Sequence, residues 1–263
     1  MLKFFQSLRS SMLEQKRFSK YLIYAVGEII LVIIGILIAL YINNWNNNNS
    51  NIDKQKILIY QVKLDLEQSV EELKDIISFH ETRAFAAAQV SQAFWKKDTL
   101  NNALVRSFGI PLSNKRYSPN MSMISSLISS GDIELVQSVT IRSQINAYFE
   151  NVNTILEDIL RYEEQYYRPG VEIVTANFDI NSFSLSHLKE EYIENITNFR
   201  LASFPKDFKE VPFPIELQDV YKNQQIYNGY GHLLISFRNT KSKYETILIQ
   251  TRNLLNALKE AEY

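Results

Sequence analysis

The chain has 263 residues, no cysteine and a formal net charge of −1. The lack of cysteine excludes disulfides, thiolate metal sites and cysteine nucleophiles, and the near-zero net charge argues against nucleic-acid binding, which needs a dense positive surface. A hydrophobic content of 46%, with only 7 glycines and 6 prolines, favours a folded domain of long helices over disorder or a turn-rich β fold.

Residues 1–20 form a basic segment that we expect to be a cytoplasmic tail. They carry Lys3, Arg9, Lys16, Arg17 and Lys20 against the single acidic residue Glu14. Because Lys and Arg accumulate on the cytoplasmic side of a membrane helix, this bias predicts a cytoplasmic N-terminus. Residues 45–263 are then extracytoplasmic, which in a bacterium with two membranes means the periplasm.

Residues 21–44 are predicted to form one transmembrane helix. The run from 21 to 42, YLIYAVGEIILVIIGILIALYI, is apolar except for Glu28, and about 20 such residues cross the ~30 Å hydrocarbon layer. It exceeds the apolar core of a signal peptide and lacks a small-x-small cleavage site, so we expect an uncleaved anchor. Tyr21, Tyr24 and Trp45 lie at its ends, where amphipathic rings set the depth of a membrane helix.

One face of the predicted span carries Glu28, Gly35 and Ala39. A carboxylate at the centre of a membrane helix costs about 2.5–3.5 kcal/mol and is a functional candidate. Gly35-x-x-x-Ala39 is a small-x-x-x-small pair, which lets another helix approach closely. We therefore expect this face to contact the lipid bilayer and another transmembrane helix, from a second copy or a membrane partner. The alternatives for Glu28 are snorkelling, neutral burial, and proton or ion conduction.

The next two segments are predicted to be a break and a long helix. Seven asparagines occur in residues 43–51, and because asparagine competes for backbone hydrogen bonds, we expect a frayed turn there. Residues 52–95 then carry apolar side chains at steps of three and four, which indicates an amphipathic helix.

Two shorter helices are predicted between residues 98 and 131. The first, over residues 100–107, is expected to be capped by Asp98 or Thr99 and stopped by Gly109 and Pro111. The second, over residues 121–130, is expected to start at the Ser118-Pro119 pair. Gly131 supplies its C-terminal stop.

Residues 138–168 have the most regular pattern in the chain, with a heptad seam that must face another helix. It comprises Ile141, Ile145, Tyr148, Val152, Ile155, Ile159, Tyr162 and Tyr166. We expect Pro169-Gly170 to end this helix and residues 171–185 to be an extended connection. A modest helix over residues 186–201, a proline-rich turn over 204–214 and one last helix from Val220 to Leu258 complete the chain.

These elements predict an all-α fold, with one N-terminal transmembrane helix followed by an elongated antiparallel helical bundle. The predicted parts are the tail 1–20, the span 21–44 and the extracytoplasmic all-α domain 45–263. Two long helices near opposite ends of the chain suit antiparallel packing, with the heptad helix as a third member.

The predicted extracytoplasmic domain has few candidate sites. His80 falls in an apolar stripe, which favours a hydrogen-bonded core histidine, and neither a zinc-helix pattern nor a spaced set of metal ligands occurs. The Glu163-Glu164 pair and the group Glu190, Glu191 and Glu194 are expected to lie on solvated faces. Tyr162, Tyr166 and Tyr167 could line a pocket or a protein contact, although core packing is the simpler interpretation. We expect no catalytic, metal-binding or cofactor-binding residue and no nucleic-acid partner.

Three short segments in and around the predicted span resemble a known protein family. Residues 20–29, then Gly35-Ile-Leu-Ile-Ala-Leu40, then Ile42-Asn-Asn-Trp-Asn46 resemble a family of single-span membrane proteins of unknown function that is common in Bacteroidota. The patch 129–135, followed by Ile141-Arg142 and Tyr148, is similar to a second recurring segment of that family. This resemblance implies a bacterial inner-membrane protein and no particular chemistry.

The sequence therefore predicts a membrane-anchored periplasmic interaction or scaffold module that is not an enzyme. The alternative is a periplasmic ligand-sensing bundle that signals through a membrane partner, since the short tail holds no output domain. A pocket with two or more convergent charges would favour the sensor. An exposed apolar strip on a smooth bundle would favour the scaffold.

Overall fold

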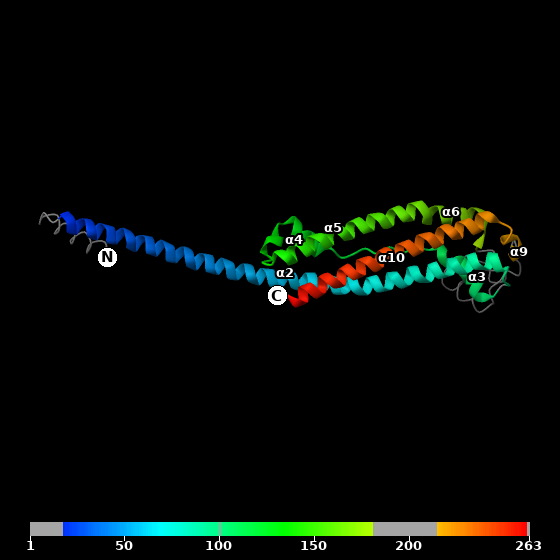
Figure 1. The fold of residues 1–263 in the computed structure, drawn as a ribbon, viewed down its shortest axis with the longest axis horizontal. Helices are drawn as coiled ribbons and strands as arrows, with labels where there is room; N and C mark the ends of the chain where they lie inside the picture. The colour runs from blue at the N-terminus through cyan, green and yellow to red at the C-terminus, as the bar shows by residue number, and fades with distance from the viewer. Residues whose placement is uncertain (1–17, 100, 181–214, 262–263) are drawn as a thin grey trace, which may run out of the picture. The chain divides into compact units, whose positions relative to one another are not determined.

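The computed structural model describes residues 18–99, 101–180 and 215–261 (Figure 1). Within these ranges the chain is helical and contains no strand, so the prediction of an all-α protein is confirmed for them. The chain divides into two compact units, residues 1–57 and 58–263, which we describe separately. The predicted helix over 186–201, the turn over 204–214 and Glu190, Glu191 and Glu194 lie outside the described residues.

Helix α2 (Phe18–Lys96) is helical through the asparagine-rich segment, so the predicted frayed turn is wrong. Each asparagine costs no more than about 0.7 kcal/mol relative to alanine in a helix interior. Strong helix-forming sequence flanks the segment on both sides, and helix propagation adds a hydrogen bond for each residue that is fixed. The local preference of asparagine is therefore outweighed.

The part of α2 in the first unit has the length and composition of a membrane span. Its apolar side chains are exposed. Among the described helices, α2 is the one that is long and apolar enough to cross a membrane. An exposed stretch of this length indicates membrane association, because water does not solvate so many apolar side chains favourably.

The segment after α2 contains α3 (Asn102–Gly109), the 3₁₀ turn η1 (Ile110–Leu112), α4 (Ser122–Ser129) and the 3₁₀ turn η2 (Asp132–Leu135). The expected caps are wrong at both helices. Asn101 caps α3 through its Oδ1, which accepts from the Leu104 amide. Met121 precedes α4 without a side-chain cap, because Ser118 and Pro119 belong to an extended segment. Gly131 ends α4 at φ +80°, as predicted.

Helix α5 (Val139–Tyr162) buries the predicted heptad seam, but Pro169-Gly170 does not end the helical segment. A five-residue π-helix, η3 (Glu163–Tyr167), links α5 to α6 (Arg168–Asn177). The Arg168 amide donates to the Glu163 carbonyl five residues earlier. This wider turn accommodates a proline, which lacks an amide hydrogen and would clash with a carbonyl in a regular helix. The predicted extended connection is therefore helical up to Asn177.

The last described helices are α9 (Leu217–Val220) and α10 (Gln224–Glu260). Asn223 caps α10, its Oδ1 accepting from the Gln225 and Ile226 amides, so Val220 lies before the long helix and not within it. The helix is continuous through Gly229 and Gly231, as predicted.

Helix α10 packs antiparallel to both long helices of the second unit (Figure 1). The Trp95 Nε1 donates to the Tyr227 hydroxyl at 3.1 Å near the start of α10. Near its end, Lys259 forms an ion pair with Glu67 at 2.7 Å. On the other side, Lys243 pairs with Asp158 at 2.7 Å. The residue numbers run in opposite directions along both contacts.

Gly229 of α10 faces Gly170 of α6 at a close approach of the two helices. A β-carbon at Gly229 would lie 2.6 Å from the Val174 Cγ2 and 3.2 Å from the Gly170 carbonyl oxygen. A β-carbon at Gly231, two residues along, would meet nothing within 4 Å. Only the first of these two glycines is therefore required by packing.

We predict opposite effects of alanine at these two positions. Gly231→Ala should stabilise the domain by up to about 1 kcal/mol, because alanine is the better helix former. Gly229→Ala should destabilise it by about 1–3 kcal/mol, since the close packing leaves no room for the methyl group. Urea unfolding of the full chain in detergent, followed by circular dichroism, measures both. Equal effects of the two substitutions would contradict the close approach of α6 and α10.

Candidate functional site

The predicted association face lies on the exposed part of α2. Glu28, Gly35 and Ala39 are all exposed, and a β-carbon at Gly35 would meet no atom within 4 Å. Tyr24 is half-buried and Trp45 is exposed, whereas the side chain of Tyr21 lies outside the described residues. Within the first unit this surface is open to lipid or to another helix.

The tyrosine group of the heptad helix divides into two environments. Tyr167 is half-buried and packs against the core, where its hydroxyl donates to the Leu112 carbonyl at 3.0 Å and its ring contacts Phe237. Tyr162 and Tyr166 are half-buried and stack with ring centroids 6.0 Å apart. Tyr166 also contacts His232 of α10 edge to face. Core packing therefore describes Tyr167, and helix contact describes the other two.

The second unit contains two apolar cores among its described residues, with a polar layer between them. One core extends along α2 as far as Ile76, and the other begins at Ala84. Between the cores each long helical segment contributes a buried polar side chain, namely His80 from α2, Glu163 from η3 and Thr240 from α10. The polar layer therefore crosses the domain at one level.

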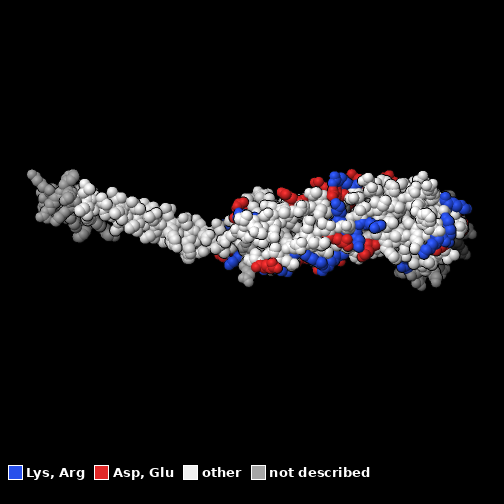
Figure 2. Space-filling view, in the orientation of Figure 1, with Lys and Arg blue, Asp and Glu red and all other residues white. Residues whose placement is uncertain are grey.

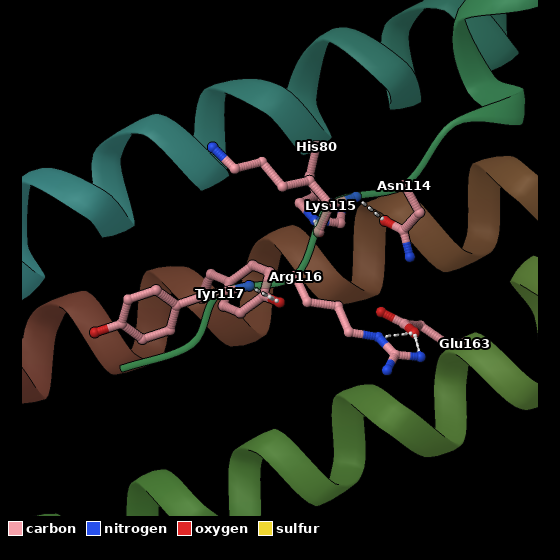
Figure 3. A network of polar contacts seen from close by, with 7 residues as sticks. His80, Asn114, Lys115, Arg116, Tyr117 and Glu163 are labelled. Atoms are coloured by element: carbon pink, nitrogen blue, oxygen red, sulfur yellow. Dashed lines mark hydrogen bonds and ion pairs between the residues drawn. The ribbon is translucent and has the colours of Figure 1, made fainter. Parts of the chain in front are cut away.

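An extended segment, residues 113–120, crosses this layer between the helices, and we call it the strap (Figure 3). Buried backbone groups without regular secondary structure need other partners. The His80 Nε2 contacts the Lys115 carbonyl at 3.0 Å, and a carbonyl only accepts, so Nε2 carries the hydrogen. The Arg83 Nε donates to the Ser113 carbonyl at 2.8 Å. The Tyr117 amide donates to the Tyr244 hydroxyl at 3.1 Å. Helices α2 and α10 thus bind three backbone groups of the strap, and the Lys115 amide donates to the Asn114 Oδ1 within it at 2.9 Å.

The strap also supplies the cation for a buried carboxylate. The Arg116 Nε donates to the Glu163 Oε2 at 2.7 Å (Figure 3). The Glu163 side chain is 3% exposed, so its predicted place on a solvated face is wrong, whereas Glu164 is exposed as expected. The π-helix begins at Glu163, and such a bulge changes the direction of the side chains on a helix. The heptad pattern carries no signal of this change.

Burial favours the uncharged forms of His80, Tyr117 and Tyr244 in and beside the polar layer. Burial lowers the pKa of His80 to about 4, and the nearby Arg83 charge acts in the same direction, while the bond to Lys115 opposes them. Burial likewise raises the pKa of Tyr244 and of Tyr117. His80 is the hydrogen-bonded core histidine that the sequence predicts. The layer therefore fixes the strap, and its geometry brings no nucleophile and base together.

A shallow pocket of about 260 Å³ lies at the far end of the second unit, where α2 meets the start of α10. Its lining residues are Phe94, Trp95, Tyr221, Lys222, Asn223, Gln224 and Tyr227. The single charged side chain among them, Lys222, is bound to Asp219 at 3.0 Å. The pocket therefore lacks the two convergent charges that would favour a charged ligand.

Neither a metal site nor a membrane partner is defined by the described residues. No group of three or more His, Asp or Glu side chains in them is placed to hold a metal ion.

An amide-lined groove of about 210 Å³ runs between α5 and α10, with Gln144, Asn151, Gln250 and Asn253 on its edges. Tyr148 also lines it, and the Tyr148 hydroxyl is hydrogen-bonded to the Thr251 hydroxyl at 3.1 Å.

Comparison with known proteins gives a family and no activity. Residues 28–196 match a family of unknown function, DUF6090. The match covers more than half of the chain, which therefore belongs to this family. It begins at Glu28 and continues through α2, the strap and α5. No curated protein and no solved structure matches the chain.

We predict that Arg116 stabilises the domain by neutralising Glu163. Arg116→Met leaves a buried carboxylate without its cation and should cost about 2–4 kcal/mol in the free energy of unfolding, because such a charge is expensive to bury. Adding Glu163→Gln to Arg116→Met should recover part of the loss. Glu164→Gln, at the exposed neighbour, should change stability by less than about 0.5 kcal/mol. Urea unfolding of these three variants and of Glu163→Gln alone tests this, and additive effects of Arg116→Met and Glu163→Gln would contradict the pairing.

We predict that His80 makes stability fall in acid. The ordinary histidine pKa of about 6.5 applies to the unfolded chain, and the folded pKa is about 4. The unfolded chain therefore binds the extra proton as pH falls through 6.5, and up to ~3 kcal/mol of stability is lost between pH 6.5 and pH 4. His80→Gln keeps an N–H donor for Lys115 and should flatten this slope. Urea unfolding of the wild type and of this variant between pH 4 and pH 6.5 measures the slope, and equal slopes would contradict the role of His80.

Proposed function

We propose that this protein is an inner-membrane scaffold, with its N-terminal tail in the cytoplasm and an elongated antiparallel helical bundle in the periplasm. One observation carries the proposal. A single helix, α2, supplies both the exposed apolar stretch and a wall of the folded domain. The same helix thus belongs both to a candidate anchor and to the folded domain, as a tethered scaffold requires.

The orientation rests on the charges at the two ends of the span. Lys and Arg concentrate before residue 21, whereas asparagines follow residue 42. Positive residues are retained on the cytoplasmic side during insertion, and this favours a periplasmic location for residues 45–263. In this orientation the apolar surface of α2 faces lipid, and Glu28, Gly35 and Ala39 supply the face for another transmembrane helix.

The surface of the domain supports a binding role more than a catalytic one. Exposed apolar residues occur on α2 beyond the span, including Tyr60 and Leu64. The titratable groups of the polar layer are buried beneath the strap and hold it in place. These are the properties of a protein that binds through its surface.

A second candidate function is a ligand-sensing bundle, and the pocket beside Trp95 is the observation that favours it. Aromatic side chains dominate its lining, so a small apolar or aromatic molecule would suit it. The pocket is shallow and carries one charged residue. We therefore rank sensing below scaffolding.

We predict that the intramembrane face drives association. Glu28→Gln and Gly35→Ile should each weaken oligomers or partner complexes by about 1–2 kcal/mol, the usual contribution of polar and small-residue contacts between membrane helices. The measurement is chemical crosslinking of the full chain in native membranes. Gly27→Ile is the matched control, since Gly27 lies about 80° away from Gly35 around the helix. If all three variants crosslinked like the wild type, the proposed face would be wrong.

A further inference from the structure

The outward face of α2 changes character a few turns beyond the span. Tyr60 and Leu64 are 62% and 46% exposed, and Ile57, one turn earlier, is 59% exposed. At 3.6 residues per turn these three lie within about 60° of one another. Farther along the helix the same face carries the exposed charges Glu67, Glu71, Lys74 and Asp75. The apolar stripe 57–64 therefore ends abruptly.

Figure 2 shows where the charged side chains of each unit lie. Charged side chains are numerous over the helices of the second unit, whereas the described part of α2 in the first unit is almost entirely white. In the interior of the second unit, Ile59, Val62 and Leu66 fill the core from the opposite side of α2. The helix is thus apolar on two faces at this level, and the described residues of the domain cover only one of them.

Lipid does not account for the uncovered face, if the span lies as proposed. Tyr60 lies 16 residues beyond the predicted end of the span at residue 44, or about 24 Å along the helix. The headgroup region extends only about 5–8 Å beyond the hydrocarbon layer. Even a helix tilted by about 20° keeps Tyr60 well outside the lipid.

We infer that the stripe of Ile57, Tyr60 and Leu64 is a parallel docking surface for a second copy of this chain. The inference rests on the proposed function, because it requires membrane anchoring. Three side chains bury far less than the ~800 Å² per partner of a stable soluble interface. Two anchored copies do not need that area, since confinement to one membrane raises their effective concentration. Each copy also presents the same stripe at the same height.

The flanking residues suit this symmetric contact. With Ile57 and Leu64 at the a positions of a parallel heptad pair and Tyr60 at d, the g positions are Lys56 and Lys63. The e positions that face them from the second copy are Gln61 and Gln68. No like-charged pair flanks the seam. At the next seam positions, Glu67 and Glu71 would each oppose their own copies, which limits the contact to the stripe.

Disulfide crosslinking tests the inference, because the natural chain contains no cysteine. Tyr60→Cys and Leu64→Cys are introduced singly into the full chain, and native membranes are oxidised with copper phenanthroline. Both should give a disulfide-linked dimer. Gln61→Cys is the matched control at the same height but about 100° around the helix. It should crosslink about tenfold less, which corresponds to 1.4 kcal/mol.

A second substitution tests the apolar character of the contact. Leu64→Lys in the Tyr60→Cys background should abolish the dimer, whereas Gln68→Lys in that background should preserve it. Both side chains are exposed, so neither change removes a core contact. Equal crosslinking at residues 60 and 61, or disulfides from Tyr60→Cys to another protein alone, would overturn the inference.

The outcome separates this inference from the proposed function. A Tyr60→Cys dimer that persists in the Gly35→Ile background supports the docking stripe and removes the intramembrane face. If Gly35→Ile weakens association and neither Tyr60→Cys nor Leu64→Cys gives a dimer, the intramembrane face is supported and the docking stripe is ruled out. If the full chain is extracted from membranes by carbonate, the anchoring fails, and both proposals fail with it.

Discussion

The domain is organised around the strap, an extended segment whose backbone groups are bound by side chains of α2 and α10. The strap lies among α2, α5 and α10 without regular secondary structure, and three of its backbone groups have partners on the helices. His80, Arg83 and Tyr244 supply those partners, and Arg116 returns a charge to Glu163. Polar side chains must therefore occur where a continuous apolar core would otherwise run, and they divide the core in two.

This division has consequences for stability. An apolar side chain in place of His80 would bury more hydrophobic surface, but it would leave the part-buried Lys115 carbonyl without this partner. An unpaired buried group costs about 1–3 kcal/mol. The polar layer also fixes the register of the helices, since His80 and Glu163 have useful partners only in one alignment. We therefore attribute the position of the strap to this layer, and the close packing farther along α10 to Gly170 and Gly229.

Helical periodicity predicted a large part of the fold, because a stripe of apolar residues must be buried whatever covers it. The seam from Ile141 to Ile159, the burial of His80 and the continuity of α10 through its glycines all followed from spacing. Helix ends predicted from single residues, such as proline, asparagine and candidate caps, were less reliable. Pro169 and the asparagine-rich segment predicted helix ends that the structure does not contain. A π-helical turn accommodates the proline. The helix on both sides of the asparagines outweighs their local preference. Asn101, not Asp98 or Thr99, caps α3, because the helix begins at Asn102 and the cap is the residue directly before it.

The sequence by itself determined the class of protein, namely a helical chain with a long apolar segment near the N-terminus and no cysteine chemistry. It also placed Glu28, Gly35 and Ala39 on one face, because helical geometry relates them over short distances. Tertiary structure alone decided that Glu163 is buried against Arg116 and that Tyr60 and Leu64 remain uncovered. These properties depend on which helices and segments come together across the domain, and residue spacing within one helix carries no information about them.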